Sequence, residues 1–134
     1  MTLVATRATG PDMDTSTGMY APQITGLIAG EDLLACAPCY IKGSDGKIYQ
    51  SNGTAATAAA DVVGFSVEAR KAGQACTLRA LGTRLGYCDA GTLTPGAKYF
   101  LAATAGRLDT AATTGGTVAI ARAVTDTDLI VLAI

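Results

Sequence analysis

Glycine-containing turns recur at short intervals along this chain, and they leave room only for brief strands between them. Clear turns lie at residues 43–46, 71–74 and 95–96, with another at 104–106 and a polar turn without glycine at 125–128. Short strands separated by such turns at intervals of roughly 8–12 residues are typical of a β-sandwich or a small β-barrel. We therefore predict an all-β fold, a small β-barrel or sandwich-like domain.

The predicted strands are the apolar or alternating runs between these turns. Cys76 and Leu78 fall on one face of a strand over residues 76–81, and the residues between them are polar. The Ala-rich residues 54–61 are the one place where a short helix competes with extended structure. Strands are expected at residues 33–41, 47–50, 62–67, 76–81, 85–88, 98–102, 118–124 and 129–134.

The chain contains a weak internal repeat. Residues 40–48 resemble residues 99–108, because each segment holds an apolar strand, a glycine turn and a second short strand. An Ala-Ala-Thr tripeptide follows each segment, at residues 55–57 and 111–113, and an apolar strand comes after it. A hairpin used twice at a spacing of about 60 residues predicts two pseudo-symmetric halves of one domain. An active site normally breaks such symmetry.

Side chains that carry chemistry are few. The chain has no His, which removes the commonest general base, the Ser-His-Asp and Cys-His arrangements and the commonest zinc ligand. Acidic pairs occur at Glu31-Asp32 and at Asp126 and Asp128. Both pairs lie in predicted turns, where Asp side chains commonly accept backbone N–H groups. We therefore expect no enzymatic activity and no cofactor.

The four cysteines give the strongest alternative to a purely structural protein. Cys36 and Cys39 form a CxxC motif, and Cys76 and Cys88 follow. Three roles are open: a redox pair, a zinc site with four Cys ligands, or structural disulfides. A redox CxxC opens a helix, whereas this one lies inside the predicted strand over residues 33–41. We expect four small, buried thiols in a reducing cytoplasm and no bound metal.

Charge and hydropathy exclude two classes of partner. The net charge is −1 and the ten Lys and Arg are scattered, so the chain offers no basic face for nucleic acid. No apolar run approaches the roughly 18 residues of a membrane span, and the N-terminus does not resemble a signal peptide. Hydrophobic residues make up 49% of the chain, but many are Ala, and there are only two Phe and no Trp. We expect a modestly stable subunit that gains stability by association.

Residues 1–22 differ from the rest, because they are polar, contain Gly and Pro and show no periodicity. Two interpretations are open: a disordered tail, or an extended arm that orders along a neighbouring subunit. The arm's contact residues would be Arg7, Met13, Met19 and Tyr20. The expected organisation is an N-terminal arm over residues 1–22 and a β-barrel-like domain over residues 23–134.

The order of turn-and-strand segments over residues 24–134 follows a recognisable pattern. The segments that carry it are Ala29-Gly30-Glu31-Asp32-Leu33, Asp45-Gly46-Lys47-Ile48-Tyr49, Val62-Val63-Gly64-Phe65, Ala72-Gly73-Gln74, Leu93-Thr94-Pro95-Gly96-Ala97-Lys98-Tyr99-Phe100 and Thr104-Ala105-Gly106-Arg107-Leu108. In this order they resemble the small capsid decoration, or cement, proteins of tailed bacteriophages. The resemblance is one of architecture and includes no catalytic residue.

The resemblance implies a homotrimer on the outer surface of the virion's icosahedral head, assembled in the host cytoplasm. It would bind the major capsid protein and hold adjacent capsid subunits together against the pressure of packaged DNA. A terminal segment often reaches a neighbour in such proteins, which favours the arm interpretation of residues 1–22. The cysteines are a departure, since the family pattern does not need them.

Two other functions stay open. A host-surface or carbohydrate-binding β module displayed on a virion would need exposed aromatic side chains clustered in loops. A small zinc or redox protein would use Cys36 and Cys39 and would bind zinc near stoichiometrically.

Overall fold

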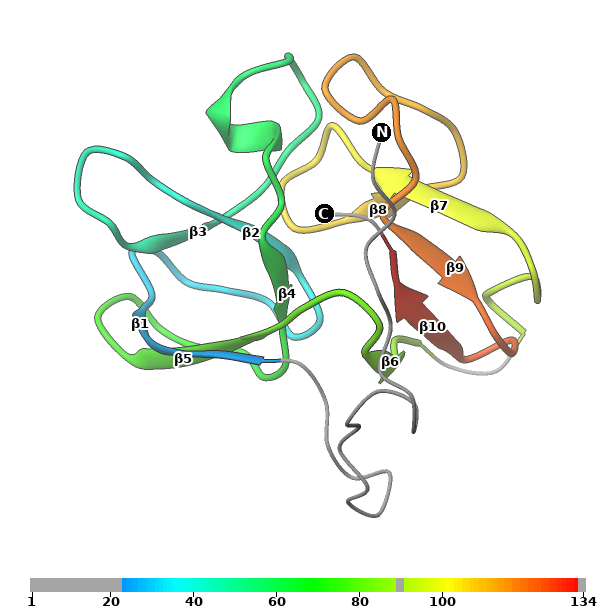
Figure 1. The fold of residues 1–134 in the computed structure, drawn as a ribbon, viewed down its shortest axis with the longest axis horizontal. Coiled ribbons are helices and arrows are strands. Elements are labelled where there is room, and N and C mark those ends of the chain that lie inside the picture. The colour runs from blue at the N-terminus through cyan, green and yellow to red at the C-terminus, as the bar shows by residue number, and fades with distance from the viewer. Residues whose placement is uncertain (1–22, 89–90, 133–134) are drawn as a thin grey trace, which may run out of the picture.

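The computed structural model describes residues 23–88 and 91–132. The chain is all-β there, as predicted: its strands form two antiparallel five-stranded sheets, and its one helical element is a single 3-10 turn, η1 (Ala58–Ala60). The two sheets lie side by side in a sandwich-like arrangement, with the first on the left in Figure 1. No helix in these residues has the length and apolar character needed to cross a membrane.

Each sheet is built from five consecutive strands. The first contains β1 (Gln23–Ile28), β2 (Pro38–Ile41), β3 (Ile48–Gln50), β4 (Gly64–Ser66) and β5 (Ala75–Arg79). The second contains β6 (Arg84–Gly86), β7 (Lys98–Leu101), β8 (Leu108–Asp109), β9 (Ala121–Ala123) and β10 (Asp128–Val131). We call residues 23–79 the first unit and residues 84–131 the second unit.

The two units have the same topology. The strand order is β1-β5-β4-β2-β3 in the first sheet and β6-β10-β9-β7-β8 in the second, so each strand has a counterpart five strands later. The paired hairpins predicted from the sequence are β2–β3 and β7–β8. The predicted internal repeat is therefore confirmed, and it extends to the whole sheet.

The two hairpin turns match position by position at an offset of 60 residues. Lys42 N donates to Lys47 O at 3.0 Å, and Ala102 N donates to Arg107 O at the same distance. Both turns place a glycine at positive φ, Gly46 at 69° and Gly106 at 73°. A glycine has no Cβ to clash there, so each turn depends on this residue type.

The sheets do not close into barrels, so the barrel alternative is wrong and the sandwich-like one is confirmed. The edges of the first sheet meet at one parallel bridge between Ala29 and Ile48, where Gly30 N donates to Ile48 O at 2.8 Å. The ladder stops there, because Gln50 N donates to the Glu31 side-chain Oε1 at 2.9 Å and not to a backbone carbonyl. In the second unit, β6 and β8 share no bridge within the described residues.

Two apolar clusters form the core, and one of them joins the units. Val62 and Phe65 come from the first unit but pack with side chains of the second. The second-unit members of this shared cluster are Leu85, Leu93, Tyr99, Leu101, Ile120, Ala121, Ala123, Leu129 and Val131. The other cluster lies within the first unit and consists of Ala29, Leu33, Ala37, Cys39, Ile48, Cys76 and Leu78. The two units therefore share one core and form one folding domain.

The strand predicted over residues 33–41 is wrong in its first half. Leu33 makes only an isolated bridge to Arg70, and Cys36 lies in a turn with φ at 56°. The Ser66 hydroxyl holds this turn, since it accepts from Ala37 N at 3.0 Å and donates to Leu34 O at 2.6 Å.

Other predicted strands are shorter than expected or run as predicted. The strand predicted over residues 118–124 is shortened to β9. The strand predicted over residues 129–134 corresponds to β10, and residues 133–134 lie outside the described part of the chain. Over residues 54–61, where a short helix competed with extended structure, the structure has only the 3-10 turn η1. The alternation in β5 is confirmed, because Cys76 and Leu78 are both buried.

Candidate functional site

The predicted contact residues of the arm lie outside the described part of the chain. Arg7, Met13, Met19 and Tyr20 all fall within residues 1–22. Their role as subunit or capsid contacts stays a prediction, as does the arm itself. The features that the structure does place are the four cysteines, the acidic pairs, one aromatic cluster and several surface hollows.

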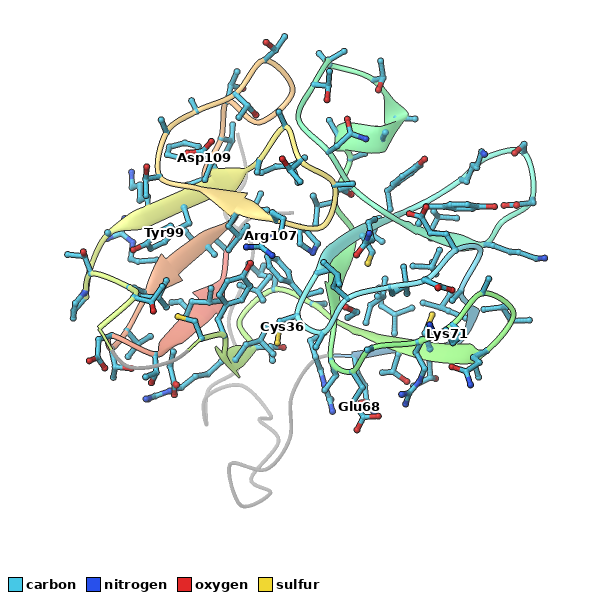
Figure 2. The ribbon with its side chains drawn as sticks, turned by 180° about the vertical axis from the view of Figure 1, so that it is seen from behind. Cys36, Glu68, Lys71, Tyr99, Arg107 and Asp109 are labelled. Atoms are coloured by element: carbon cyan, nitrogen blue, oxygen red, sulfur yellow. The ribbon has the colours of Figure 1, made fainter. Side chains whose placement is uncertain are left out.

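The four cysteines are free thiols and are divided between the two units. Cys39 and Cys76 belong to the core of the first unit, where the Cys39 Sγ donates to Ala37 O at 3.2 Å. Cys36 and Cys88 are half-buried, and Figure 2 shows Cys36 near the middle of the molecule, where the two units meet. Within the described residues, no group of three or more Cys, Asp or Glu side chains is arranged to hold a metal ion.

The electrostatics of the CxxC motif oppose redox chemistry. Burial raises the pKa of the Cys39 thiol to about 12, and it also raises the pKa values of the Cys36 and Cys76 thiols. A redox-active cysteine needs the opposite shift, because the thiolate is the nucleophile. The motif also opens no helix, since Cys36 lies in a turn and Cys39 lies in β2. These thiols are small packing groups.

The acidic pairs are hydrogen-bonded to segments far away in the chain, and not to the backbone of their own turns as their sequence positions predicted. Asp32 Oδ1 accepts from Ala72 N at 3.0 Å, and this hydrogen bond, with help from Lys71, lowers the pKa of the Asp32 carboxyl. Asp126 Oδ2 accepts from Gly91 N at 3.0 Å. Asp128 Oδ2 accepts from the Arg84 Nε at 2.8 Å, which likewise lowers the pKa of Asp128.

Further acceptor bonds involve Glu31 with Gln50 N, Asp45 with Lys47 N and Asp109 with Ala111 N. Asp45 and Asp109 thus hold their own turns, whereas Glu31 and the acceptors Asp32 and Asp126 bond to backbone N–H groups of segments far away in the chain.

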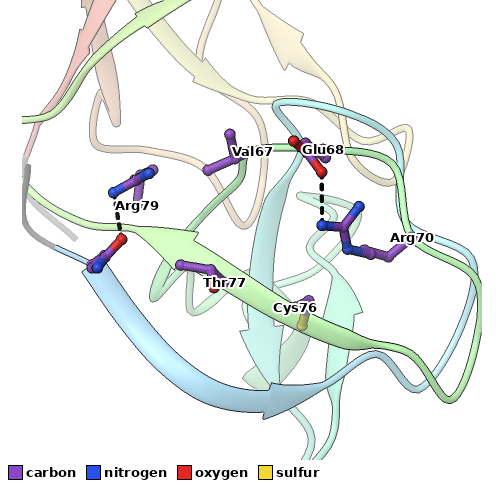
Figure 3. A pocket seen from close by; sticks show the side chains of 7 residues that line it. Val67, Glu68, Arg70, Cys76, Thr77 and Arg79 are labelled. Carbon is purple, nitrogen blue, oxygen red and sulfur yellow. Dashed lines mark hydrogen bonds and ion pairs between the residues drawn. The ribbon is translucent and has the colours of Figure 1, made fainter.

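A cavity of about 190 Å³ lies beside β5, and Figure 3 shows its lining. Two arginines face it, but each is held by a neighbour: Arg70 Nη2 lies 2.7 Å from Glu68 Oε2, and Arg79 Nη1 donates to Gln23 Oε1 at 2.6 Å. The cavity is smaller than the roughly 300–1,000 Å³ of typical ligand pockets. Its small volume and its paired arginines do not favour a ligand site.

The sequence reasoning missed an aromatic cluster on the β2–β3 hairpin. Tyr40 and Tyr49 are cross-strand neighbours with ring centroids 6.2 Å apart. Tyr49 Oη donates to Asp45 Oδ2 at 2.7 Å, and the Lys42 Nζ lies 4.7 Å from the Tyr49 ring centroid. Gly30 packs against the same ring. The signal was available, because the two tyrosines are equally distant from the predicted turn at residues 43–46.

This cluster is a poor match to the open aromatic platform that a sugar-binding module would need. The Tyr49 ring is enclosed by Lys42 and Gly30, and its hydroxyl is already bonded to Asp45. The carbohydrate-binding alternative stays a prediction.

Large apolar side chains are exposed on both units. They are Ile28, Leu34, Ile41, Leu81, Val118 and Val124, with exposed fractions from 40% to 65%. An apolar groove of about 500 Å³ lies between the units, and its walls include Val63 of the first unit and Val118 of the second. Exposed apolar surface of this kind is typical of contact with other proteins.

The chain matches no protein-family model, and it matches no curated protein. The candidate functional features of the described residues are the exposed apolar side chains and the groove described above.

Proposed function

We propose that this chain is a structural virion protein, a decoration protein that binds the outer surface of a tailed-phage capsid and stabilises contacts between major capsid protein subunits. The observation that carries the proposal is the set of large apolar side chains exposed on both units. The carboxylates of Glu31, Asp32 and Asp126 on the same scaffold accept hydrogen bonds from its backbone. Such a molecule can gain free energy by covering apolar surface with protein. The resemblance in the order of turns and strands supplies the identity of the partner.

The proposed mechanism depends on the contact area that each subunit adds and on the number of subunits that bind together. Each subunit would add contact area across a joint between capsid proteins. A homotrimer would engage several joints at once, and linked weak contacts give a retention much stronger than any one of them. Association into a trimer would also cover part of the apolar surface that each subunit exposes.

Cryo-electron microscopy of virions that contain this chain tests the proposal. We expect density for the chain on the outer capsid surface at three-fold or quasi-three-fold positions, in contact with the major capsid protein. A purified chain that never binds capsids lacking it, in co-sedimentation at physiological salt, would contradict the proposal.

The arm over residues 1–22 has a separate test. We expect a variant lacking residues 1–20 to keep its β-sheet circular dichroism spectrum, because both sheets begin at or after Gln23. We also expect it to be retained more weakly on capsids during dilution and sedimentation. Retention equal to that of the full chain would make the segment an ordinary tail.

A further inference from the structure

The contact between the two units of one chain joins two different surfaces. The hairpin turn of the second unit lies against the segment that follows β3 in the first. Gly53 N donates to Ala102 O at 2.7 Å, and Gly106 N donates to Ser51 O at 2.9 Å. This contact is heterologous, since a turn on one side meets a strand end on the other.

Because the two units repeat each other, the turn and the strand end that form this contact each have an equivalent in the other unit. Each equivalent is more exposed than the residues that form the internal contact. We call residues 41–47 the first-unit turn and residues 109–118 the second-unit loop. Ile41 is 44% exposed, whereas its counterpart Leu101 in the second unit is 1% exposed.

The same contrast holds on the receiving side. Ser51 is fully buried and Gly53 is buried in the contact between the units. Their counterparts in the second-unit loop, Ala111 and Thr113, are exposed and half-buried respectively. One part of the second-unit loop already contacts the first unit, since Gly115 N donates to Gly53 O at 2.9 Å. Ala111, Ala112 and Thr114 of the same loop stay exposed.

The two uncovered surfaces have compatible chemistry. Ile41 in the first-unit turn and Val118 in the second-unit loop are large, exposed apolar side chains. Lys47 corresponds to Arg107, and the second-unit loop carries the opposite charge at the exposed Asp109.

The first-unit turn differs from the turn of the second unit in two side chains. Both are directed away from the backbone groups of the turn that would form the contact. Lys42 and Asp45 replace Ala102 and Ala105, but both contact Tyr49 of their own hairpin.

The backbone of the first-unit turn holds the same two groups that make the internal contact. Gly46 N donates to Lys42 O at 2.8 Å within the turn. Their counterparts, Gly106 N and Ala102 O, bond instead to Ser51 and Gly53 of the other unit. On the receiving side, Thr113 N, the counterpart of Gly53 N, donates to Gly116 O at 3.0 Å. Docking would therefore exchange two hydrogen bonds within chains for two between chains, and the gain would come from covering apolar surface.

We propose that copies of this chain associate head to tail, with the first-unit turn of one copy seated on the second-unit loop of the next. This association repeats between chains the contact that joins the two units inside each chain. It goes beyond the capsid role and does not rest on it, since it concerns the purified chain alone. Contacts of this type close into a ring when the rotation allows it and form a filament when it does not.

Directional cross-linking tests the proposal in a Cys36→Ser, Cys88→Ser background. Gly43 and Thr114 correspond to Ala103 and Thr54, whose O and Oγ1 atoms lie 3.2 Å apart across the internal contact. A side chain at Gly43 meets open space, and Thr114 is exposed. We expect a short bis-maleimide to give covalent dimers when chains with Gly43→Cys are mixed with chains with Thr114→Cys. Each variant alone should give none.

An internal pair controls for the reach of the reagent. A chain carrying both Thr54→Cys and Ala103→Cys should cross-link within itself. Equal dimer yield from either single variant alone, or no dimer in the mixture while the internal pair reacts, would overturn the proposal.

Molar mass from light scattering gives an independent readout. We expect the unmodified chain to form oligomers whose mass rises with concentration to a defined limit. Ala112→Arg, in the second-unit loop, should return the protein to the monomer, whereas Ala72→Arg, in the exposed turn over residues 71–74, should not. A monomer at every soluble concentration, or equal masses for the two variants, would overturn the proposal.

Discussion

Cys36 is the one described residue other than glycine with a positive φ, at 56°. An L side chain in this left-handed region crowds the following carbonyl oxygen. The conformation is retained because the Ser66 hydroxyl bonds to both Ala37 N and Leu34 O on either side of Cys36. Ser66 itself is buried in β4, so a distant strand fixes the geometry of the CxxC turn.

This strain predicts an unusual order of stability among Cys36 variants. Cys36→Gly should be more stable to unfolding than Cys36→Ala by about 1 kcal/mol, because glycine has no Cβ penalty at positive φ. Both variants lose the same half-buried thiol, so the difference between their free energies of unfolding reports the backbone strain at residue 36. Urea denaturation of the two variants measures the difference, and an Ala variant at least as stable as the Gly variant would contradict the interpretation.

The buried Cys39 thiol predicts a loss of stability in alkali. Burial raises the pKa of this thiol from 9.0, its value when exposed, to about 12 in the folded chain. Between these two values the unfolded chain has lost the proton while the folded chain keeps it. The free energy of unfolding should therefore fall as pH rises from about 9 toward 12. Cys39→Ala should show a shallower decline, measured by denaturant titration at each pH, and identical slopes would count against the prediction.

The two hairpins are equivalent elements in different surroundings. Gly46 and Gly106 share a positive φ, but a Cβ at Gly46 would meet open space. At Gly106 it would lie 2.5 Å from the Gln50 Oε1 and 3.3 Å from the Ala37 Cβ, both in the first unit. The second hairpin is thus packed tightly against its neighbour.

A pair of alanine substitutions separates backbone strain from this packing. Gly46→Ala should cost about 1–2 kcal/mol of stability from the left-handed conformation alone. Gly106→Ala should cost clearly more, because the new methyl also displaces the Gln50 side chain, which accepts from Leu34 N. Thermal unfolding of both variants measures which of the two loses more stability. Equal losses would show that the contact between the units accommodates the added methyl group without cost.

Local patterns predicted the elements that local interactions determine. The turns at residues 43–46 and 104–106 were predictable, since a glycine there needs only its own hairpin. The strand over residues 33–41 was mispredicted, because apolar side chains suit both a strand and the observed turn. What decides between them is the Ser66 hydroxyl, which lies 29 residues after Ala37. The tyrosine pair at Tyr40 and Tyr49 was likewise missed, although the hairpin register would have revealed it.

The whole molecule depends on a core that crosses from one unit to the other. Phe65 and Val62 belong to the first unit and pack with Leu101 and Ile120 of the second. The sequence repeat predicted two similar halves, but spacing alone gives no information about how they pack.

This core predicts one cooperative unfolding transition. Hydrogen exchange in denaturant should show β2 and β9 losing protection at the same midpoint, although they belong to different units. Phe65→Ala should lower the free energy of unfolding by about 3–5 kcal/mol, since the side chain is fully buried.

A matched substitution completes the test. Val118→Ala should cost little, because Val118 is 65% exposed. Two separate midpoints, or a Phe65→Ala effect confined to the first unit, would show that the units are independent.

The shared strand order also dictates when each sheet can be completed. Within the described residues, β1 pairs only with β5, the last strand of its unit, and β6 is likewise joined to its sheet through β10. Pairings between strands so far apart in the chain slow folding. During synthesis the first sheet can be complete once Arg79 has left the ribosome, while Phe65 still lacks its partners. Every nascent chain therefore passes through a stage in which all five strands of the first sheet have been made while Phe65 still has no second-unit side chains to pack against.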